Sequence, residues 1–510
     1  MSEVIGAEEI GARIDAGFRA LPLARLADAA LGRARELGAG HADVRVERIV
    51  SQSVHLRDAG VTGVADVGTE GLAVRVVVDG TWGFASHVEL TPERAVATAE
   101  RAVAVARALA PLARERVERA DEPVHAGVAW SSGYEFDPFT VPVGEKVALL
   151  ADRSRRLLAA PGVDHVEAGL AIVRENKYYA DLAGTSTLQQ RVRVAPSLSA
   201  TTVDHAGGFE TMSSLAPPAP RGWEYLTGTG WDWDDELERL PGWLSEKAAA
   251  PSVEPGRYDL VIDPSNLWLT IHESIGHATE YDRAIGYEAA YAGTSFATPE
   301  LLGSLRYGSP LMHVTGDRTH PHGLATVGFD DDGVATGQWD LVRDGVLVGY
   351  QLDRTFAPRL GLARSNGCAF ADSPHRVPLQ RMANVSLQPD PSADRSTNDL
   401  IAGVENGIYV VGDRSWSIDM QRANFQFTGQ RFFRIRGGRL AGQLRDVAYQ
   451  AVTTDFWGSL DGLGGPSTWT VFGAMNCGKA QPGQSAAVGH GCPSALFRQV
   501  NVLNTTSEAA

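Results

Sequence analysis

The chain has 510 residues, enough for two or three domains that each bury a core. Its composition, 44% hydrophobic and 21% charged, is typical of a soluble globular protein, and no stretch approaches the roughly 18 uninterrupted apolar residues that span a bilayer. The formal net charge of −16 and the lack of a dense Lys/Arg run argue against direct nucleic-acid binding.

The compartment is inferred from the N-terminus and the cysteines. The acidic start, MSEVIGAEEIGARIDAG, has no apolar core of the kind that signal peptides carry. The three cysteines, Cys368, Cys477 and Cys492, are an odd number and too few for a disulfide framework. We therefore expect a cytoplasmic protein with reduced thiols and no membrane association.

The first part of the chain predicts helices packed on a sheet. Residues 22–38 carry apolar side chains at helical spacing. Strand-like alternation follows in three segments: 42–50, 53–58 and 71–86. Asp79-Gly80 divides the last segment into two strands joined by a hairpin turn. A helix is expected from Thr91, a good N-cap, to about Leu109, with Pro92 in its first turn.

A second helix and two more strands complete this half. Residues 110–140 are charged and irregular, and the helix is expected from about residue 143. The strand-like segments are 164–182 and 186–203. A region rich in Pro, Gly and Trp ends at a predicted linker, AAAPSVEPG, at 248–256.

We place the main domain boundary at this linker. The N-terminal domain, residues 1–250, is expected to consist of helices packed on a sheet. The C-terminal domain, residues 251–510, opens with a short buried strand in YDLVIDP, and the helix that carries IHESIGH follows. The rest is strand-like and glycine-rich, in segments 323–333, 338–353, 406–416 and 431–442. Asp344-Gly345 and Gly437-Gly438 are expected turns.

The segment IHESIGH raises the question of a metal site. A helix turns about 100° per residue, so His272 and His277 lie about 140° apart on a straight helix. Both can reach one ion only if a π-bulge widens the helix locally, and Gly276 leaves room for this distortion. The spacing therefore predicts a deformed helix if the two histidines share a metal with Glu273 beside them.

Two histidines make an incomplete site, because catalytic zinc takes three protein ligands and a water. Composition alone leaves the third ligand open among Glu280, Asp282, His313, His320, His322, His375, Cys477 and His490. Cys477 is attractive because it lies in a polar, glycine-rich segment, AMNCGKAQPGQ, that predicts a turn. Thiolate is also a strong zinc ligand.

Several ordered motifs resemble one family. Residues 272–282, HESIGHATEYD, resemble the signature HExxGHxxExD of the TldD/PmbA metallopeptidases, in the TldD branch. Further similar stretches are VGFDDDG (327–333), LVRDGVLVGYQLDR (341–354), SNGCAFADSPHRVPLQRMANVSLQP (365–389) and CGKAQPGQSAAVGHGCP (477–493). Residues 67–86 are similar to a sheet segment of the family. The resemblance is strong from about 258 to 493 and loose before.

The resemblance implies a function and an assembly. Zinc would be bound by His272, His277 and Cys477, with Glu273 as the general base. The substrates would be unfolded or flexible peptides, cleaved in an enclosed chamber. The chain would work as a dimer, with itself or with a paralogue that lacks the motif. The N-terminal domain would contribute to the chamber and the dimer interface.

Four more residues match the family motifs. Glu280 and Asp282 are expected to orient the ligands by accepting a free ring N–H, the alternative being an acidic pair on the surface. Arg381 and Asn384 either position the substrate or hold two strands together. The sequence leaves both readings open.

Other residues receive a structural interpretation. The acidic run 330–332 is expected in a solvated turn rather than a hard-cation site. His320 and His322 are expected in a loop rather than a second metal site. Cys368 and Cys492 depart from the arginine and glutamine of the family and are expected to be packing residues.

The fold class that follows is α+β, with an N-terminal α/β domain and a strand-rich C-terminal domain carrying a metal-binding helix. The function that follows is a zinc-dependent metallopeptidase. Two alternatives stay open. One is a non-proteolytic binding or regulatory subunit of the kind linked to DNA gyrase, which has no need of an intact ligand set. The other is a metal-dependent hydrolase of small amides.

Overall fold

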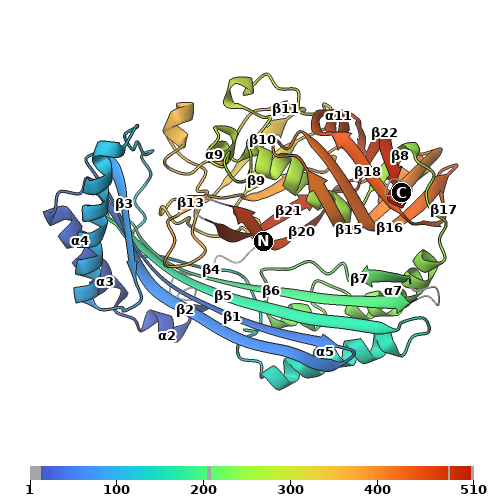
Figure 1. Ribbon diagram of the computed structural model, residues 1–510, viewed down its shortest axis with the longest axis horizontal. Helices are drawn as coiled ribbons and strands as arrows, with labels where there is room; N and C mark the ends of the chain where they lie inside the picture. Colours follow the sequence, from blue (N-terminus) through green and yellow to red (C-terminus); the bar gives the residue numbers. More distant parts are fainter. Residues whose placement is uncertain (1–12, 204–207, 480–482, 507–510) are drawn as a thin grey trace.

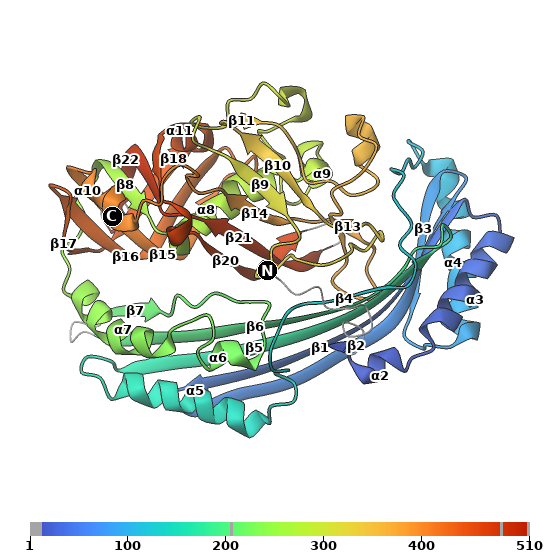
Figure 2. The same ribbon diagram turned by 180° about the vertical axis from the view of Figure 1, so that it is seen from behind.

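The computed structural model describes residues 13–203, 208–479 and 483–506. A long curved sheet is built from the first half of the chain, and a strand-rich part from the second half lies over its concave face (Figure 1). Seen from behind, the helices of the first half cover the convex face (Figure 2). This mixed α and β arrangement confirms the predicted fold class. No helix in the described part of the chain combines the length and the apolar character that a membrane crossing requires.

The N-terminal sheet consists of β1 (His41–Arg57), β2 (Gly60–Val78), β3 (Thr81–His87), β4 (Val128–Ser131), β5 (His165–Asp181), β6 (Ser186–Val203) and β7 (Phe209–Ser213). The strand order is β3-β2-β1-β5-β6-β4, with β7 paired to β6. Segments 42–50 and 53–58 belong to one strand rather than two, because pairing with β5 runs unbroken from Asp43 to Arg57. The hairpin at Asp79-Gly80 is confirmed, with both residues at positive φ.

The helices of this half are α2 (Ala16–Arg19), α3 (Leu23–Glu36), α4 (Pro92–Leu109), α5 (Val143–Leu158), α6 (Trp223–Leu226) and α7 (Trp233–Ala248). The predicted N-cap of α4 is confirmed, since the Thr91 hydroxyl accepts a bond from the Arg94 N–H at 3.3 Å. α3 and α4 pack on β1–β3 in one apolar cluster, and α5 and α7 pack on β5 and β6 in another.

Helix α7 lies in the Pro-, Gly- and Trp-rich region where no helix was predicted. It contains Pro241 in its interior, which obscures the helical pattern. Its core-facing residues Leu237, Leu240 and Leu244 are buried against the sheet. Tertiary burial therefore stabilises a helix that local propensity does not favour.

The strands of the C-terminal part are β8 (Gly256–Ile262), β9 (Val314–Asp317), β10 (Gln338–Arg343), β11 (Val346–Leu347), β12 (Ala369–Phe370), β13 (Leu379–Gln380), β14 (Asn384–Leu387), β15 (Asn406–Ile418), β16 (Asn424–Arg436), β17 (Arg439–Leu444), β18 (Val447–Val452), β19 (Leu460–Leu463), β20 (Thr470–Lys479), β21 (Gln484–Cys492) and β22 (Ala495–Asn504). The helices are α8 (Pro264–Ile271), α9 (Tyr281–Ala284), α10 (Thr397–Ala402) and α11 (Thr453–Gly458). The largest sheet has the order β15-β8-β22-β18-β16-β17. The turns at Asp344-Gly345 and Gly437-Gly438 are confirmed by their positive φ.

Helix α8 lies at the centre of this part. All of its residues are buried, and it contacts β14, β15, β20 and β21. Its burial on every side agrees with its sequence, PSNLWLTI, in which five of eight residues are apolar and the polar side chains of Ser265, Asn266 and Thr270 are all hydrogen-bonded. The core therefore fixes the position of the residues that follow Ile271, beginning with His272.

The acidic run 330–332 corrects two predictions. Segment 323–333 forms loops and turns rather than a strand, with only an isolated bridge between Phe329 and Ala335. All three carboxylates are buried, so a solvated turn is wrong. Lys177 on β5 donates to Asp331 at 2.8 Å, and Arg75 on β2 pairs with Asp332. The cations of the concave sheet face draw these carboxylates into the junction between the two parts.

Candidate metal centre

The helix that carries the histidines is widened where the sequence predicts it. α8 begins at Pro264, where the Asp263 carboxylate caps the Ser265 N–H at 3.0 Å. After Ile271 the chain forms a π-helical turn, His272–Gly276, and then a 3₁₀ turn, His277–Thr279. The predicted π-bulge is therefore confirmed. Glycine at position 276 suits this packing, because a Cβ there would lie 2.6 Å from the sulfur of Met382.

The π-helical turn brings three donor side chains together. The ligand atoms of His272, His277 and Cys477 lie within 4.8 Å of one another. The Cys477 Sγ is 3.6 Å from His277 Nε2, and the two imidazole rings are 4.7 Å apart between centroids. Cys477 lies on β20 rather than in the predicted turn, and residues 480–482 of that segment lie outside the described residues.

Each histidine is held through its other ring nitrogen. His277 Nδ1 is 2.8 Å from a carboxylate oxygen of Glu280, so it donates its proton there and leaves Nε2 unprotonated. His490 Nδ1 lies 2.9 Å from the carbonyl of Val385, and its Nε2 lies 2.8 Å from His272 Nδ1. The carbonyl can only accept, so His490 donates to Val385 and accepts from His272. His272 Nε2 is thereby free as well.

Burial keeps these imidazoles neutral. It lowers the pKa of His272 well below the ordinary value, with help from the neighbouring rings. It lowers the pKa of His277 to about 3 and that of His490 to about 4. Burial also raises the pKa of the Cys477 thiol to about 12. A cation beside Cys477 would reverse this last shift, because it favours the thiolate.

The three donors fit a divalent transition metal. Two imidazole nitrogens with lone pairs and one sulfur form a set that suits zinc, and three protein ligands leave a position open for water. Carboxylate and imidazole partners already fix the orientation of both rings, as metal-ligating histidines require. The arrangement can therefore hold a metal and expose it to a reactant.

Glu273 is held by residues that the sequence did not single out. Its carboxylate forms an ion pair with Arg422 and a bond with the Trp416 side chain. Arg422 lies in the turn between β15 and β16, with φ of 65°. Burial raises the pKa of Glu273, and Arg422 counteracts this shift. The carboxylate thus stands beside the ligand cluster in a fixed orientation.

Glu280 and Asp282 are buried, which excludes a surface acidic pair. Lys479 donates to Glu280 at 3.2 Å and to Asp282 at 2.9 Å. Burial, the largest single influence, would raise the pKa of Glu280, but the Lys479 ammonium, the His277 hydrogen bond and Arg381 together outweigh burial and lower it. Glu280 is therefore anionic beside His277, whereas Asp282 acts on the ligands only through Lys479.

Arg381 and Asn384 hold strands together. Arg381 donates to the carbonyl of Cys477 at 2.6 Å and to that of Gln484 at 3.3 Å, and so clamps β20 to β21. Asn384 donates to the carbonyl of Asp317 at 2.7 Å and accepts from the Ala325 N–H at 2.9 Å. Arg381 thereby positions Cys477, and Asn384 acts on the loop after β9.

The other candidates for a third ligand lie elsewhere. His313 pairs with Asp340, His322 contacts Arg221, and the ring of His320 packs against Trp469. The His320–His322 pair thus has ordinary loop contacts. His375 lies beside Gly71 of β2. Cys368 and Cys492 are free and fully buried, as expected of packing residues.

Sequence reasoning missed three functional neighbours of the cluster. His490 was weighed only as a ligand, and its role as the partner of His272 needs the fold. Lys479 is the last residue of the CGK motif that contains Cys477, and this motif could have indicated that Lys479 belongs to the site. No sequence pattern near Arg422 indicates its contact with Glu273, because the two residues are 149 positions apart.

Comparisons with known proteins agree with this geometry. A family model described as the PmbA/TldA metallopeptidase C-terminal domain matches residues 255–504. Another, described as PmbA/TldA metallopeptidase domain 1, matches residues 42–106. Both ends of the described fold are thus similar to one family, and the first match contains the whole ligand cluster.

Individual relatives span nearly the whole chain. A metalloprotease of Methanothermobacter thermautotrophicus is 27% identical over 472 residues, which cover 91% of this chain and 96% of that protein. A zinc metalloprotease TldD homolog of Saccharolobus solfataricus is 22% identical over 479 residues, covering 92% and 98%. The solved structure of a proposed DNA gyrase modulator of Thermotoga maritima has a TM-score of 0.72 at 16% identity, covering 93% of this chain and 99% of that one. The last similarity concerns the fold alone.

Proposed function

The chain belongs to the PmbA/TldA family of metallopeptidases, and we propose that it is a zinc enzyme that cleaves flexible peptides. The observation that carries the proposal is the convergence of His272, His277 and Cys477 beside Glu273. Two of these donors are 200 positions apart in the chain and are buried together. A subunit that only binds a partner has no need of such an assembled donor set.

The side chains divide the chemical work. His272, His277 and Cys477 would hold the zinc. When bound, zinc acidifies water and polarises a peptide carbonyl. Glu273 accepts the proton of the attacking water and returns it to the leaving amine. Arg422 holds the Glu273 carboxylate in place, so little orientation has to be gained during the reaction.

Burial of the site supports a flexible substrate. Each of His272, Glu273, His277 and Cys477 is at most 7% exposed. A rigid folded surface cannot bring its backbone to side chains at this depth, whereas an extended peptide can. Recognition through the backbone, as in strand addition, suits such a substrate and gives little side-chain specificity.

The test compares Glu273→Gln with Cys477→Ala, measuring zinc per chain and cleavage of a mixed peptide library. Glu273→Gln keeps the shape of the side chain but cannot take a proton. We expect it to retain zinc and to lose about 10²–10⁴-fold in rate. Cys477→Ala should lose zinc as well as activity. Unchanged cleavage in Glu273→Gln would exclude Glu273 as the general base. Cleavage confined to small amides would show that peptides are not the substrates.

We also propose that the chain works as a dimer, with itself or with a paralogue that lacks the metal motif. β3 pairs with β2 from Leu72 to Val78, so within the described residues the 60–71 part of β2 pairs with β1 alone. Val61, Val64 and Val67 on this open edge are each about half exposed, at 52%, 51% and 55%. An unprotected edge with apolar side chains favours strand pairing with a partner.

Light scattering of the purified chain tests this assembly. A dimer that Val64→Lys converts to a monomer would identify self-pairing at β2. A monomeric parent chain would leave the paralogue as the partner. A dimer that Val64→Lys does not change would exclude this edge as the interface.

We further propose a cytoplasmic location. All three cysteines are free, and Cys477 must be reduced to bind zinc.

A further inference from the structure

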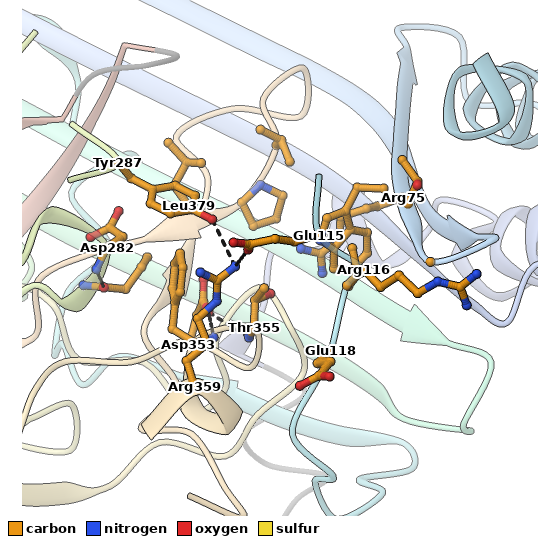
Figure 3. A pocket seen from close by; sticks show the side chains of 18 of the residues that line it. Arg75, Glu115, Arg116, Glu118, Asp282, Tyr287, Asp353, Thr355, Arg359 and Leu379 are labelled. Carbon is orange, nitrogen blue, oxygen red and sulfur yellow. Dashed lines mark hydrogen bonds and ion pairs between the residues drawn. The ribbon is translucent and has the colours of Figure 1, made fainter. Parts of the chain in front are cut away.

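A large cavity lies between the two parts of the molecule, close to the metal centre but not lined by its ligands. Its volume is about 880 Å³, within the range of small-molecule and short-peptide sites. One wall comes from β3, the end of α4 and residues 115–118; the opposite wall comes from the C-terminal part. Figure 3 shows both walls, with Glu115 from one wall meeting Arg359 and Tyr287 from the other.

Apolar and aromatic side chains form much of the lining. They are Trp82, Leu109, Val117, Tyr287, Phe356 and Leu379. Arg359 packs on the aromatic wall and joins it to the opposite wall: it donates to the Tyr287 hydroxyl at 3.1 Å and to Glu115 at 2.5 Å, and its guanidinium lies 5.6 Å from the centre of the Phe356 ring. Tyr287 nevertheless stays 54% exposed, although it is a large amphipathic side chain. Such a wall favours an apolar or aromatic group as the occupant.

The wall of the cavity also contains a buried, unpaired hydrogen-bond donor. Gln380 is 1% exposed, and its carbonyl accepts the Asp282 N–H at 3.1 Å. Its amide nitrogen has no hydrogen-bond partner within the described part of the chain. A buried donor left unpaired costs about 1–3 kcal/mol of free energy. A turn of the Gln380 side chain toward the cavity would let a carbonyl of a ligand accept from this nitrogen and recover that cost. A peptide backbone supplies such carbonyls.

The strand that carries Gln380 has an open side. β13 pairs with β12 alone among the described strands, and Val377, Pro378, Leu379 and Gln380 all line the cavity. An extended segment can therefore lie beside β13 and place alternate side chains against the aromatic wall. This argues for a peptide rather than a compact metabolite.

The cavity and the metal centre are neighbours along one strand. Lys479 lines the cavity and Cys477 belongs to the donor cluster, two positions apart on β20. Pairing with β21 is regular from Cys477 to Lys479, so both side chains point to the same face, about 7 Å apart along the strand. A peptide that occupies the cavity is thus within two or three residues of the metal centre.

We propose that this cavity is a binding subsite for an extended peptide, taking one apolar or aromatic side chain against Tyr287 and Phe356 and one backbone carbonyl on Gln380. The inference rests on the proposed peptidase function and adds a substrate preference to it. Backbone capture at the metal centre is unselective. The cavity, by contrast, has an aromatic wall and a lining in which five carboxylates outnumber four cations, and both features disfavour a carboxylate side chain. The enzyme therefore prefers flexible peptides with a bulky apolar residue near the cleaved bond.

Binding is measured without cleavage, on the full zinc-loaded Glu273→Gln chain. The probes are fluorescein-labelled Gly/Ser-rich octapeptides that carry a single Phe or a single Asp. We expect the Phe peptide to bind about tenfold more tightly in fluorescence anisotropy. Tyr287→Ala and Leu109→Ala, from opposite walls, should each weaken Phe-peptide binding about three- to tenfold. Tyr287→Phe, which returns the ring, should restore affinity.

A matched control separates the cavity from a general surface effect. Tyr291 is 66% exposed and does not line the cavity, so Tyr291→Ala should leave binding within twofold. Equal affinity for the Phe and Asp peptides would overturn the proposal, as would an unchanged affinity in Tyr287→Ala and Leu109→Ala. If Glu273→Gln binds the Phe peptide selectively but the parent chain cleaves no peptide, the proposed function is refuted and the proposed subsite is supported. If the parent chain cleaves peptides but Glu273→Gln binds the Phe and Asp peptides equally, the proposed function is supported and the subsite is refuted.

Discussion

At the scale of single residues, the metal centre depends on partners that hold its donors. Glu280 fixes His277, and His490 fixes His272 in the tautomer that leaves Nε2 free. Arg422 does the same for Glu273 by an ion pair. Because each orienting group is itself buried or bonded, the cluster is arranged before any substrate arrives.

Arg422→Ala tests the positioning of Glu273. Without the guanidinium the carboxylate can rotate away from the cluster, and misplacement by about 1 Å costs about 10²-fold in rate. We expect kcat for a mixed-peptide substrate to fall by about tenfold to a hundredfold, with KM within about twofold. Arg422→Lys, which keeps the charge, should recover part of the loss.

The control for this variant is Arg414→Ala. Arg414 lies on β15, the strand that precedes the turn of Arg422, and its side chain is 42% exposed, with a long ion pair to Glu210 at 3.8 Å. Its removal should leave kcat unchanged. A KM increase without a kcat decrease in Arg422→Ala would show that Arg422 binds substrate rather than positioning Glu273.

At the scale of elements, the π-helical turn sets the geometry of the site. Five positions separate the two histidines, and only the widened turn brings their Nε2 atoms to one point. The turn follows a fully buried helix and packs against Met382, which approaches at Gly276. The deformation is therefore held by the core around it.

Gly276→Ala tests this element. The added Cβ would lie 2.6 Å from the Met382 sulfur, which is the flexible end of a side chain and can yield in part. We expect a loss of about 1–3 kcal/mol in the free energy of unfolding, and weaker zinc binding in a chelator competition. A stable variant with unchanged zinc affinity would contradict the tight packing.

Gly32→Ala is the matched control, because Gly32 lies inside α3 with nothing within 4 Å of an added Cβ. It should stabilise the chain by about 0.5–1 kcal/mol, the usual gain for alanine in a helix.

At the scale of the whole molecule, buried ion pairs join the N-terminal sheet to the C-terminal part. Arg75 on β2 bonds Asp43 on β1 at 2.9 Å and also pairs with Asp332. Burial, the largest single influence, would raise the pKa of Asp43, but Arg75, the His41 hydrogen bond and Arg119 together outweigh burial and leave the pKa below its usual range. The junction is therefore charged at neutral pH and sensitive to acid.

The lowered pKa of Asp43 determines how the stability of the protein depends on pH. A carboxyl with a depressed folded-state pKa contributes stability above its unfolded pKa, about 3.9, and loses it as the pH falls further. Asp43→Asn should cost about 3 kcal/mol at pH 7 in denaturant unfolding. The difference from the parent should shrink below about pH 4. A constant difference from pH 7 to pH 3, or a loss of the same size in the exposed control Asp28→Asn, would contradict the assignment.

The sequence by itself determined the features that neighbouring residues encode. Helical spacing and a capping threonine gave α3 and α4, Asp79-Gly80 gave the hairpin, and the five-residue histidine spacing with Gly276 predicted the π-bulge. The order of the motifs predicted the family and the fold class. Each of these signals lies within a few positions of the chain, where periodicity and turn chemistry act.

Only the tertiary structure decided the partners of the site. It paired Arg422 with Glu273 and His490 with His272, buried the acidic run 330–332 against the sheet, and formed the cavity beside Lys479. It also made a continuous helix of residues 233–248 in spite of Pro241 in its interior. These contacts join residues remote in the chain. Their free energies arise from desolvation and charge pairing that exist only once the two parts have packed together.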